Sequence, residues 1–283
     1  MFQKSIRQCR NKLLLVQNCY RGRSSSVLPS QAVGMAPRIV LAFDAYGTLL
    51  STESIAKKLS SHFGEEKAKT IAKAWRTLQL EYTWRANSMG VYHNFSRYTK
   101  RALSNALAES EVSLNDGQTD EMMKAYDSLT TFPDVPSMLE KIKSAPNVIS
   151  KTVIFSNGTH AMVSSSVKNS PDLSPYASAF DEIVSVDDVR KFKPAPETYH
   201  HLAEKFGKSA ENKEEMGEVW LVSGNPFDVV GARAVGMNAI WVDRAGNGWQ
   251  DALMPGSWSG PTEIVRSLEE VVDVVVKWAE GGK

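Results

Sequence analysis

Cysteine is scarce in this sequence of 283 residues. The two cysteines, Cys9 and Cys19, both lie near the N-terminus, so the rest of the chain can form no disulfide and offers no thiolate nucleophile or cysteine metal ligand. Long apolar runs are also absent, since none approaches the roughly 20 residues that a bilayer-spanning helix needs. A disulfide scaffold and a cysteine-dependent enzyme are therefore excluded for most of the chain, and we expect no membrane partner.

A large excess of either charge is missing too, because 33 basic and 32 acidic residues give a formal net charge of +1. The charges are unevenly distributed along the chain. Residues 1–43 contain seven basic residues and no acidic one, which leaves 26 basic and 32 acidic residues for the rest. A mildly acidic protein lacks the basic surface that nucleic acid requires, so we expect no nucleic-acid partner.

The basic segment at residues 1–36 is rich in Arg, Ser and Gln, which is typical of a mitochondrial transit peptide. Two alternatives stay open: a disordered extension, and a functional start at Met35. We therefore leave this segment out of the fold argument. We expect a cytoplasmic protein, or a mitochondrial one if the segment is a transit peptide.

After this segment comes an apolar run, Ile39–Phe43, that ends at Asp44 and is followed by a turn at Gly47. A run without polar alternation predicts a strand buried on both faces, as in a parallel sheet. Ligands of open α/β sheets bind beyond the carboxyl ends of the strands, so we expect Asp44 at the mouth of an active site. A second aspartate two residues later would serve phosphoryl transfer as an acid or metal ligand, but this chain has Tyr46 there.

Helices without any strand-like run are predicted for residues 52 to about 130, with Ser51 or Thr52 as the first N-cap. Further helices in this region are expected around residues 97–107 and 120–129. One helix within it should carry an apolar face formed by Ala74, Trp75, Leu78 and Tyr82.

Strands and helices alternate in the second half of the chain. We predict strands at 151–155, 182–186, 218–222 and 238–242, and helices at 135–144, 160–169, 196–206 and 227–235. A capping box at Ser267–Glu270 should open a last helix. Such alternation predicts an α/β fold with a Rossmann-like, doubly wound parallel sheet. The core domain would comprise residues 37–50 and 134–283, with a helical cap domain inserted at residues 51–133.

Polar groups follow four of the predicted strands, at what should be one edge of the sheet. They are Asp44, Ser156-Asn157-Gly158-Thr159, Lys193 and Ser223-Gly224-Asn225-Pro226-Phe227-Asp228. Each alone has a structural explanation: a turn, a surface lysine, or a carboxylate near a helix start. Their shared position at successive strand ends instead indicates one polar crevice.

These four segments resemble, in order and approximate spacing, the four motifs of the haloacid dehalogenase superfamily. Within it the sequence resembles the type II L-2-haloacid dehalogenases more than the phosphatases. The phosphatase pattern has Asp-x-Asp in its first motif and a Gly-Asp pair four residues before its last aspartate, where this chain has Tyr46 and Gly224. Because Mg²⁺ needs several hard oxygen ligands, we expect no metal site and no cofactor.

The predicted cap resembles the same family independently, through Trp75-Arg76, Gln79-Leu80-Glu81-Tyr82-Thr83-Trp84, Met89, Tyr92, Asn94 and Phe95. By this resemblance Arg76 is the arginine that faces the substrate. From the residues alone, a solvated arginine paired with Glu81 or another nearby acid is the alternative. A cation rising from an apolar helix face would need an anion opposite it.

The resemblance implies a covalent mechanism on a short 2-haloalkanoic acid. The Asp44 carboxylate would displace the halide from the α-carbon, and water would then attack the ester carbonyl of Asp44, releasing a 2-hydroxy acid of inverted configuration. Arg76 and Asn157 would accept the halide. Ser156 and the backbone N–H groups of Ala45, Tyr46 and Asn157 would hold the substrate carboxylate.

The remaining roles follow from the same resemblance. Lys193 would steady Asp44, Ser223 and Asn225 would fix Lys193 and the hydrolytic water, and Asp228 would orient or activate that water. Thr48 would bind the nucleophile loop. The pocket walls would be Tyr46, Leu80, Phe95 and Phe227, with Tyr199 behind them. Thr77 and Phe227 depart from the family pattern, which affects the shape of the pocket more than its chemistry.

Three other functions stay open: a magnesium-dependent phosphatase, a related hydrolase with an unhalogenated substrate, and a binding protein without chemistry. The last would be expected to lack one of Asp44, Arg76, Lys193 and Asp228, and all four are present. The expected partner is a small-molecule 2-haloacid, and a homodimer is compatible with the resemblance.

Overall fold

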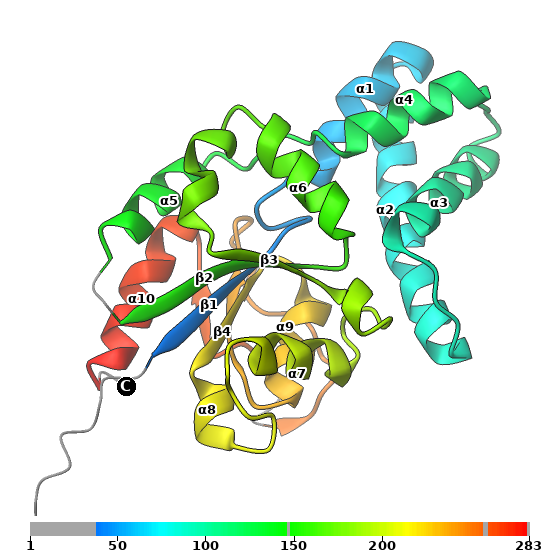
Figure 1. Cartoon of the computed structure of the whole chain (residues 1–283). Helices are drawn as coiled ribbons and strands as arrows, with labels where there is room; N and C mark the ends of the chain where they lie inside the picture. Colours follow the sequence, from blue (N-terminus) through cyan, green and yellow to red (C-terminus); the bar gives the residue numbers. More distant parts are fainter. Residues whose placement is uncertain (1–37, 146–147, 257–259, 282–283) are drawn as a thin grey trace, which may run out of the picture. The chain divides into compact units, whose positions relative to one another are not determined.

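The computed structural model describes residues 38–145, 148–256 and 260–281 (Figure 1). The basic segment predicted at residues 1–36 lies outside the described residues. Within the described ranges, no helix combines the length and the hydropathy that a membrane crossing requires.

The core is a six-stranded sheet with the strand order β3-β2-β1-β4-β5-β6 (Figure 1), and every pairing in it is parallel. The strands are β1 (Ile39–Asp44), β2 (Ile149–Ser156), β3 (Glu182–Ser185), β4 (Val219–Ser223), β5 (Asn238–Val242) and β6 (Glu263–Val265). All six residues of β1 are buried, as its apolar run predicts. The predicted α/β class and parallel sheet are confirmed. Of the six strands, only β6 was not predicted.

Helices cover both faces of the sheet. On one face lie α5 (Val135–Lys143), α6 (His160–Asn169) and α10 (Val271–Ala279), and on the other α7 (Pro196–Lys205) and α9 (Pro226–Ala234) (Figure 1). The short α8 (Lys213–Gly217) precedes β4. The predicted capping box is present, because Ser267 and Glu270 bond reciprocally at the 3₁₀ turn Leu268–Glu270 that leads into α10.

Between β1 and α5 the chain forms only helices, together called here the helical insert. They are α1 (Ile55–Phe63), α2 (Glu65–Met89), α3 (Phe95–Glu109) and α4 (Asp116–Tyr126), preceded by the 3₁₀ turn η1 (Thr52–Ser54). All four helices fall within residues 51–133. The division into a core domain and a cap domain at these boundaries stays a prediction.

Three local predictions in the helical insert were inaccurate. Ser51 precedes η1 without a side-chain capping bond. α4 begins at Asp116 rather than near 120, because Asn115 and Gln118 form a capping box there. The buried face of α2 includes Trp75 and Leu78 but also polar residues, whereas the expected Ala74 and Tyr82 are only partly buried. Helices α1 and α3 both pack on α2, which widens its buried face beyond a simple apolar stripe.

The sheet brings the predicted polar residues to one place because β1 lies between β2 and β4. The strand order reverses direction beside β1, and the carboxyl end of a sheet at such a switch point is where α/β proteins bind ligands. Asp44 ends β1, Ser156 ends β2 and Ser223 ends β4. The topology therefore brings these three residues to one edge of the sheet.

Arg244, after β5, fixes the turn that follows β1, and its removal should weaken the fold. Its guanidinium donates to both carboxylate oxygens of Asp134 at 2.9 Å and to the carbonyl of Thr48 at 2.9 Å. The pair is partly exposed, so we expect Arg244→Ala to lower the free energy of unfolding by only about 1–2 kcal/mol, measured by urea denaturation. Arg101→Ala, which removes an exposed arginine on α3, should change it by less than about 0.5 kcal/mol. Equal effects of the two substitutions would contradict this role of Arg244.

Candidate active site

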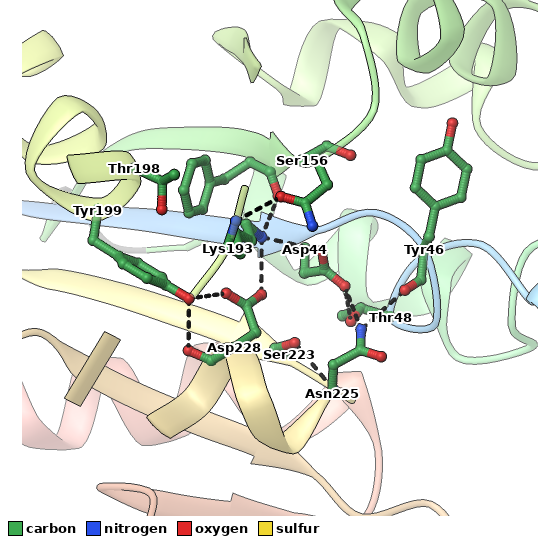
Figure 2. Close-up of polar contacts among 12 residues, drawn as sticks. Asp44, Tyr46, Thr48, Ser156, Lys193, Thr198, Tyr199, Ser223, Asn225 and Asp228 are labelled. Atoms are coloured by element: carbon green, nitrogen blue, oxygen red, sulfur yellow. Dashed lines mark hydrogen bonds and ion pairs between the residues drawn. The ribbon is translucent and has the colours of Figure 1, made fainter. Parts of the chain in front are cut away.

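Asp44 lies at the centre of a network of hydrogen-bond donors (Figure 2). Its side chain is almost buried, with 6 % of the residue exposed. Oδ1 accepts from Lys193 Nζ at 3.1 Å, and Oδ2 accepts from Thr48 Oγ1 at 2.9 Å and Asn225 Nδ2 at 2.8 Å. Three donors from three separate segments therefore orient one carboxylate, and the predicted contact of Thr48 is present.

Lys193 is the buried cation of the site, with 1 % of the residue exposed. Its Nζ bridges Asp44 and Asp228 Oδ2, at 2.8 Å from the latter, and also donates to the carbonyl of Phe155 at 2.8 Å. Its backbone N–H donates to Asn157 Oδ1 at 2.9 Å. A lysine so deeply buried requires paired anions, and here two carboxylates supply them.

Asp228, in the first turn of α9, is fully buried. Its Oδ1 accepts from the hydroxyl of Tyr199 at 2.8 Å and its Oδ2 from Lys193 (Figure 2). Burial is the main cause that raises the pKa of Asp228 above its ordinary value, with a further rise from Asp44, while Lys193 acts in the opposite direction. Tyr199 thus lies behind the site, as the sequence predicts.

Arg76 reaches the site from α2, where its side chain is partly buried. Nη2 donates to the carbonyl of Tyr46 at 3.0 Å and to Asn225 Oδ1 at 3.3 Å, and Nη1 donates to Gln79 Oε1 at 2.8 Å. The alternative pairing with Glu81 is wrong, since Glu81 pairs with Arg85. Among the described residues Arg76 forms no ion pair, so no carboxylate of this part of the chain neutralises its charge.

Asn225 connects Asp44, at the end of β1, to Arg76 of the helical insert. Besides Asp44 and Arg76, it contacts the carbonyl of Tyr46, to which Nδ2 donates at 2.9 Å. Ser223 was expected to fix Lys193, but its Oγ instead accepts the backbone N–H of Asn225 at 3.1 Å, because it ends β4 directly before the turn that carries Asn225. Ser223 therefore positions Asn225 rather than the lysine. Ser156 Oγ accepts the N–H of Gly158 at 2.9 Å.

Tyr46 takes part through its backbone more than through its ring. The ring points away from Asp44 (Figure 2), stacks on Phe95 with centroids 5.8 Å apart, and lies 5.5 Å from the ring of Tyr126. Its hydroxyl is buried without a hydrogen-bond partner among the described residues, and burial is the main cause that raises its pKa. The carbonyl of Tyr46, in contrast, accepts from Arg76 and Asn225.

The other predicted pocket residues differ in their burial and contacts. Phe95 is buried and Leu80 is partly exposed on α2. Phe227 packs edge-on against Trp84 of α2, with centroids 5.4 Å apart. The carbonyl of Ala45 closes the turn after Asp44 by accepting from the N–H groups of residues 49 and 50. Contacts of these residues with a substrate stay a prediction.

Two polar residues that support the site were missed. Gln79 is fully buried; it accepts from Arg76, accepts from Tyr126 at 2.9 Å and donates to Thr99 Oγ1 at 2.7 Å. The sequence did offer a signal: Gln79 places an amide on the apolar face of its helix, three residues after Arg76, where the two side chains can meet. Asn87, near the end of α2, bonds the backbone N–H and carbonyl of Phe192, next to Lys193, and no local pattern marks it.

The donor set around Asp44 does not fit a divalent cation. Its nearest side chains are a lysine, a hydroxyl and an amide nitrogen, all of which donate. No carboxylate can stand at position 224 without a backbone shift, because a Cβ on Gly224 would lie 2.5 Å from the carbonyl oxygen of Gly47. Within the described residues, no three His, Cys, Asp or Glu side chains gather as metal ligands.

The parallel sheet, the helical insert after β1 and the aspartate–lysine pair at the switch point together define a class of hydrolases with a Rossmann-like core. The chain belongs to the haloacid dehalogenase-like hydrolase family, whose family model matches residues 40–236.

Three similar proteins share most of their length with this chain. It is 34% identical over 205 residues to (S)-2-haloacid dehalogenase 4A of Burkholderia cepacia, covering 72% of this chain and 83% of the relative. It is 33% identical over 234 residues to (S)-2-haloacid dehalogenase of Pseudomonas fluorescens, covering 83% and 95%. The solved structure of L-2-haloacid dehalogenase from Xanthobacter autotrophicus with chloropropionic acid covalently bound is similar at a TM-score of 0.71 and 28% identity, covering 84% of this chain and 98% of that one.

Proposed function

We propose that this protein hydrolyses the carbon–halogen bond of short (S)-2-haloalkanoic acids through an ester intermediate on Asp44. The observation that carries the proposal is that Asn225 donates to the oriented Asp44 carboxylate and accepts from Arg76, a guanidinium that forms no ion pair among the described residues. A nucleophilic anion next to an unneutralised cation suits a substrate that is an anion and releases an anion. The names of the relatives agree with this substrate class.

In the first step an Asp44 oxygen forms a bond to the α-carbon while the carbon–halogen bond breaks and its electron pair leaves with the halide. Arg76 and the amide of Asn157 would stabilise the departing halide. Ser156 and the N–H groups of the Ala45–Tyr46 turn would hold the substrate carboxylate. The covalently bound chloropropionic acid in the Xanthobacter structure supports an intermediate of this kind.

In the second step water attacks the carbonyl carbon of the Asp44 ester, and the bond between that carbon and the ester oxygen, which came from Asp44, breaks. The ester oxygen takes up one proton of the water and leaves as the hydroxyl group of the 2-hydroxy acid, and the other proton is released to solvent. Thr48, Asn225 and Lys193 already donate to this carboxyl group, so they would stabilise the negative charge that develops on it. Asp228 would accept the proton of the water, directly or through the network that includes Lys193 and Tyr199.

The pH dependence of the hydrolysis should reflect Asp228. Because burial raises the pKa of Asp228, its carboxylate becomes protonated at a pH higher than the ordinary value of 3.8 and then can accept no proton. We expect kcat to fall toward acid with a midpoint above pH 4, and Asp228→Asn to reduce kcat at least about 100-fold at neutral pH. Halide release between pH 4 and 9 measures both. A kcat that stays constant down to pH 4 would contradict this role.

The proposal includes catalysis without a metal, which the donor set around Asp44 and the closed position of Gly224 support. The test is chloride release from the two enantiomers of 2-chloropropionate, with and without excess EDTA. We expect turnover of the (S) enantiomer, little of the (R) enantiomer, and the same rate with EDTA. Loss of chloride release with EDTA would contradict catalysis without a metal, and magnesium-dependent phosphate release without dehalogenation would replace this proposal by a phosphatase.

A further inference from the structure

A hollow that is open to solvent reaches Arg76 on the side of α2 that faces η1. It has a volume of about 610 Å³ and is lined by Thr52 and Glu53 of η1 and by Lys69, Lys73, Arg76 and Thr77 of α2, among others. We call it the entrance pocket. Arg76 forms its link to the catalytic network, because the same guanidinium donates to Asn225, whose amide donates to Asp44.

The charges of the entrance pocket are unbalanced. Three cations line it, Lys69, Lys73 and Arg76, against one acid, Glu53. Glu66, at 3.2 Å from Lys69, offsets part of that lysine's charge, but both side chains are largely exposed and the pair is weak. Lys73 is exposed and, among the described residues, forms no ion pair and no side-chain hydrogen bond.

Helical geometry explains why these cations share one side. At about 100° per residue, Lys69 and Lys73 project within about 60° of the direction of Arg76. They form a row that begins in solvent and ends at the guanidinium. Lys67, on the same helix, projects about 180° away from Arg76 and is exposed, but it does not line the pocket.

We infer that Lys73 and Lys69 form an electrostatic entry path that draws the anionic substrate into the entrance pocket and toward Arg76. The inference rests on the proposed function for the identity of the substrate, a 2-haloalkanoate. A row of like charges in a pocket raises the local concentration of the opposite ion and thus the capture rate, and salt screens this effect. Neither lysine takes part in the chemical step.

The test compares kcat/KM for (S)-2-chloropropionate in the wild type, Lys73→Glu, Lys73→Gln and the matched control Lys67→Glu. At about 100 mM ionic strength, where charges act over about 10 Å, we expect Lys73→Glu to lower kcat/KM about threefold. Lys73→Gln should have about half that effect on a logarithmic scale, and Lys67→Glu less than about 1.3-fold. At about 500 mM of a halide-free salt, the four proteins should agree within about 1.3-fold. Circular dichroism checks that each variant is folded.

Two results would overturn the entry path: equal effects of Lys73→Glu and Lys67→Glu, or an effect of Lys73→Glu that salt does not reduce. A wild type that releases no halide would instead overturn the proposed function. The entry path then has its own readout, the Kd of L-lactate, an anion that carries the same carboxylate, measured by calorimetry. Weaker binding to Lys73→Glu than to Lys67→Glu at low salt supports the path, and equal binding rejects it.

Discussion

The Asp44→Asn variant is expected to release halide from (S)-2-chloropropionate at least about 10⁴-fold more slowly than the wild type. An amide has nearly the shape of a carboxylate, but it carries no negative charge and is a poor nucleophile. Asp44 is the carboxylate on which Lys193, Thr48 and Asn225 all converge, and every other acid of the network is held behind Lys193. No neighbouring group can replace it.

Initial rates of halide release measure this effect, and circular dichroism checks that the variant is folded. Asp116→Asn, the same chemical change at an exposed site on α4, serves as the matched control and should retain full activity. Retention of more than about 1% of the activity by Asp44→Asn would show that another group attacks the substrate.

The Lys193→Met variant is expected to lose about 3–5 kcal/mol of its free energy of unfolding, together with nearly all activity. The substitution keeps most of the side-chain volume but leaves two buried carboxylates, Asp44 and Asp228, without the cation that they share. For a chain of this size the loss corresponds to a fall in Tm of about 6–20 °C.

The loss in Lys193→Met should depend on pH in a defined direction. The pKa of Asp228 is already raised by burial, and Lys193 opposes that rise, so removing the lysine raises the pKa of Asp228 further. A group whose pKa is raised on folding favours the folded state below its unfolded pKa and loses that contribution as pH rises through the folded value. The destabilisation should therefore be largest at neutral pH and smaller near pH 4.

Urea denaturation at pH 7 and pH 4.5 measures the loss of unfolding free energy in Lys193→Met and its dependence on pH. Adding Asp228→Asn to Lys193→Met removes one of the stranded charges and should recover at least about 1 kcal/mol at pH 7. A loss that is equal at the two pH values, or no recovery in the double variant, would contradict this electrostatic account.

Much of the fold follows from local sequence signals. β1, β4 and β5 each contain an apolar run of four or more residues, β2 contains the shorter run Val153–Phe155, and the helices between the strands carry apolar faces, with a side-chain cap at Thr159 before α6. The signal fails at β6, which has only three residues and exposes Glu263 and Ile264, so no apolar run marks it. The insert helix α2 was only partly predicted, because helices on two sides bury polar residues such as Gln79 that an apolar-face argument leaves out.

The candidate site was predictable where a residue ends a strand and less so where it depends on tertiary contacts. Asp44, Ser156 and Ser223 end β1, β2 and β4 as predicted. Lys193 follows a turn, and only the fold reveals that it joins Asp44 to Asp228. The tether at Asn87 was missed because it joins segments far apart in the sequence, whereas the observed partner of Ser223 is the backbone N–H of Asn225, only two residues away.

The origin of the product oxygen tests the ester intermediate most directly. A single turnover of (S)-2-chloropropionate with excess enzyme in water enriched in ¹⁸O, followed by mass spectrometry of the product and of the peptide that contains Asp44, measures it. The ester mechanism predicts that the first 2-hydroxy acid carries an unlabelled hydroxyl oxygen taken from Asp44, while the Asp44 carboxylate gains ¹⁸O. A labelled product with an unlabelled Asp44 would mean that water attacks the substrate directly and would contradict the ester.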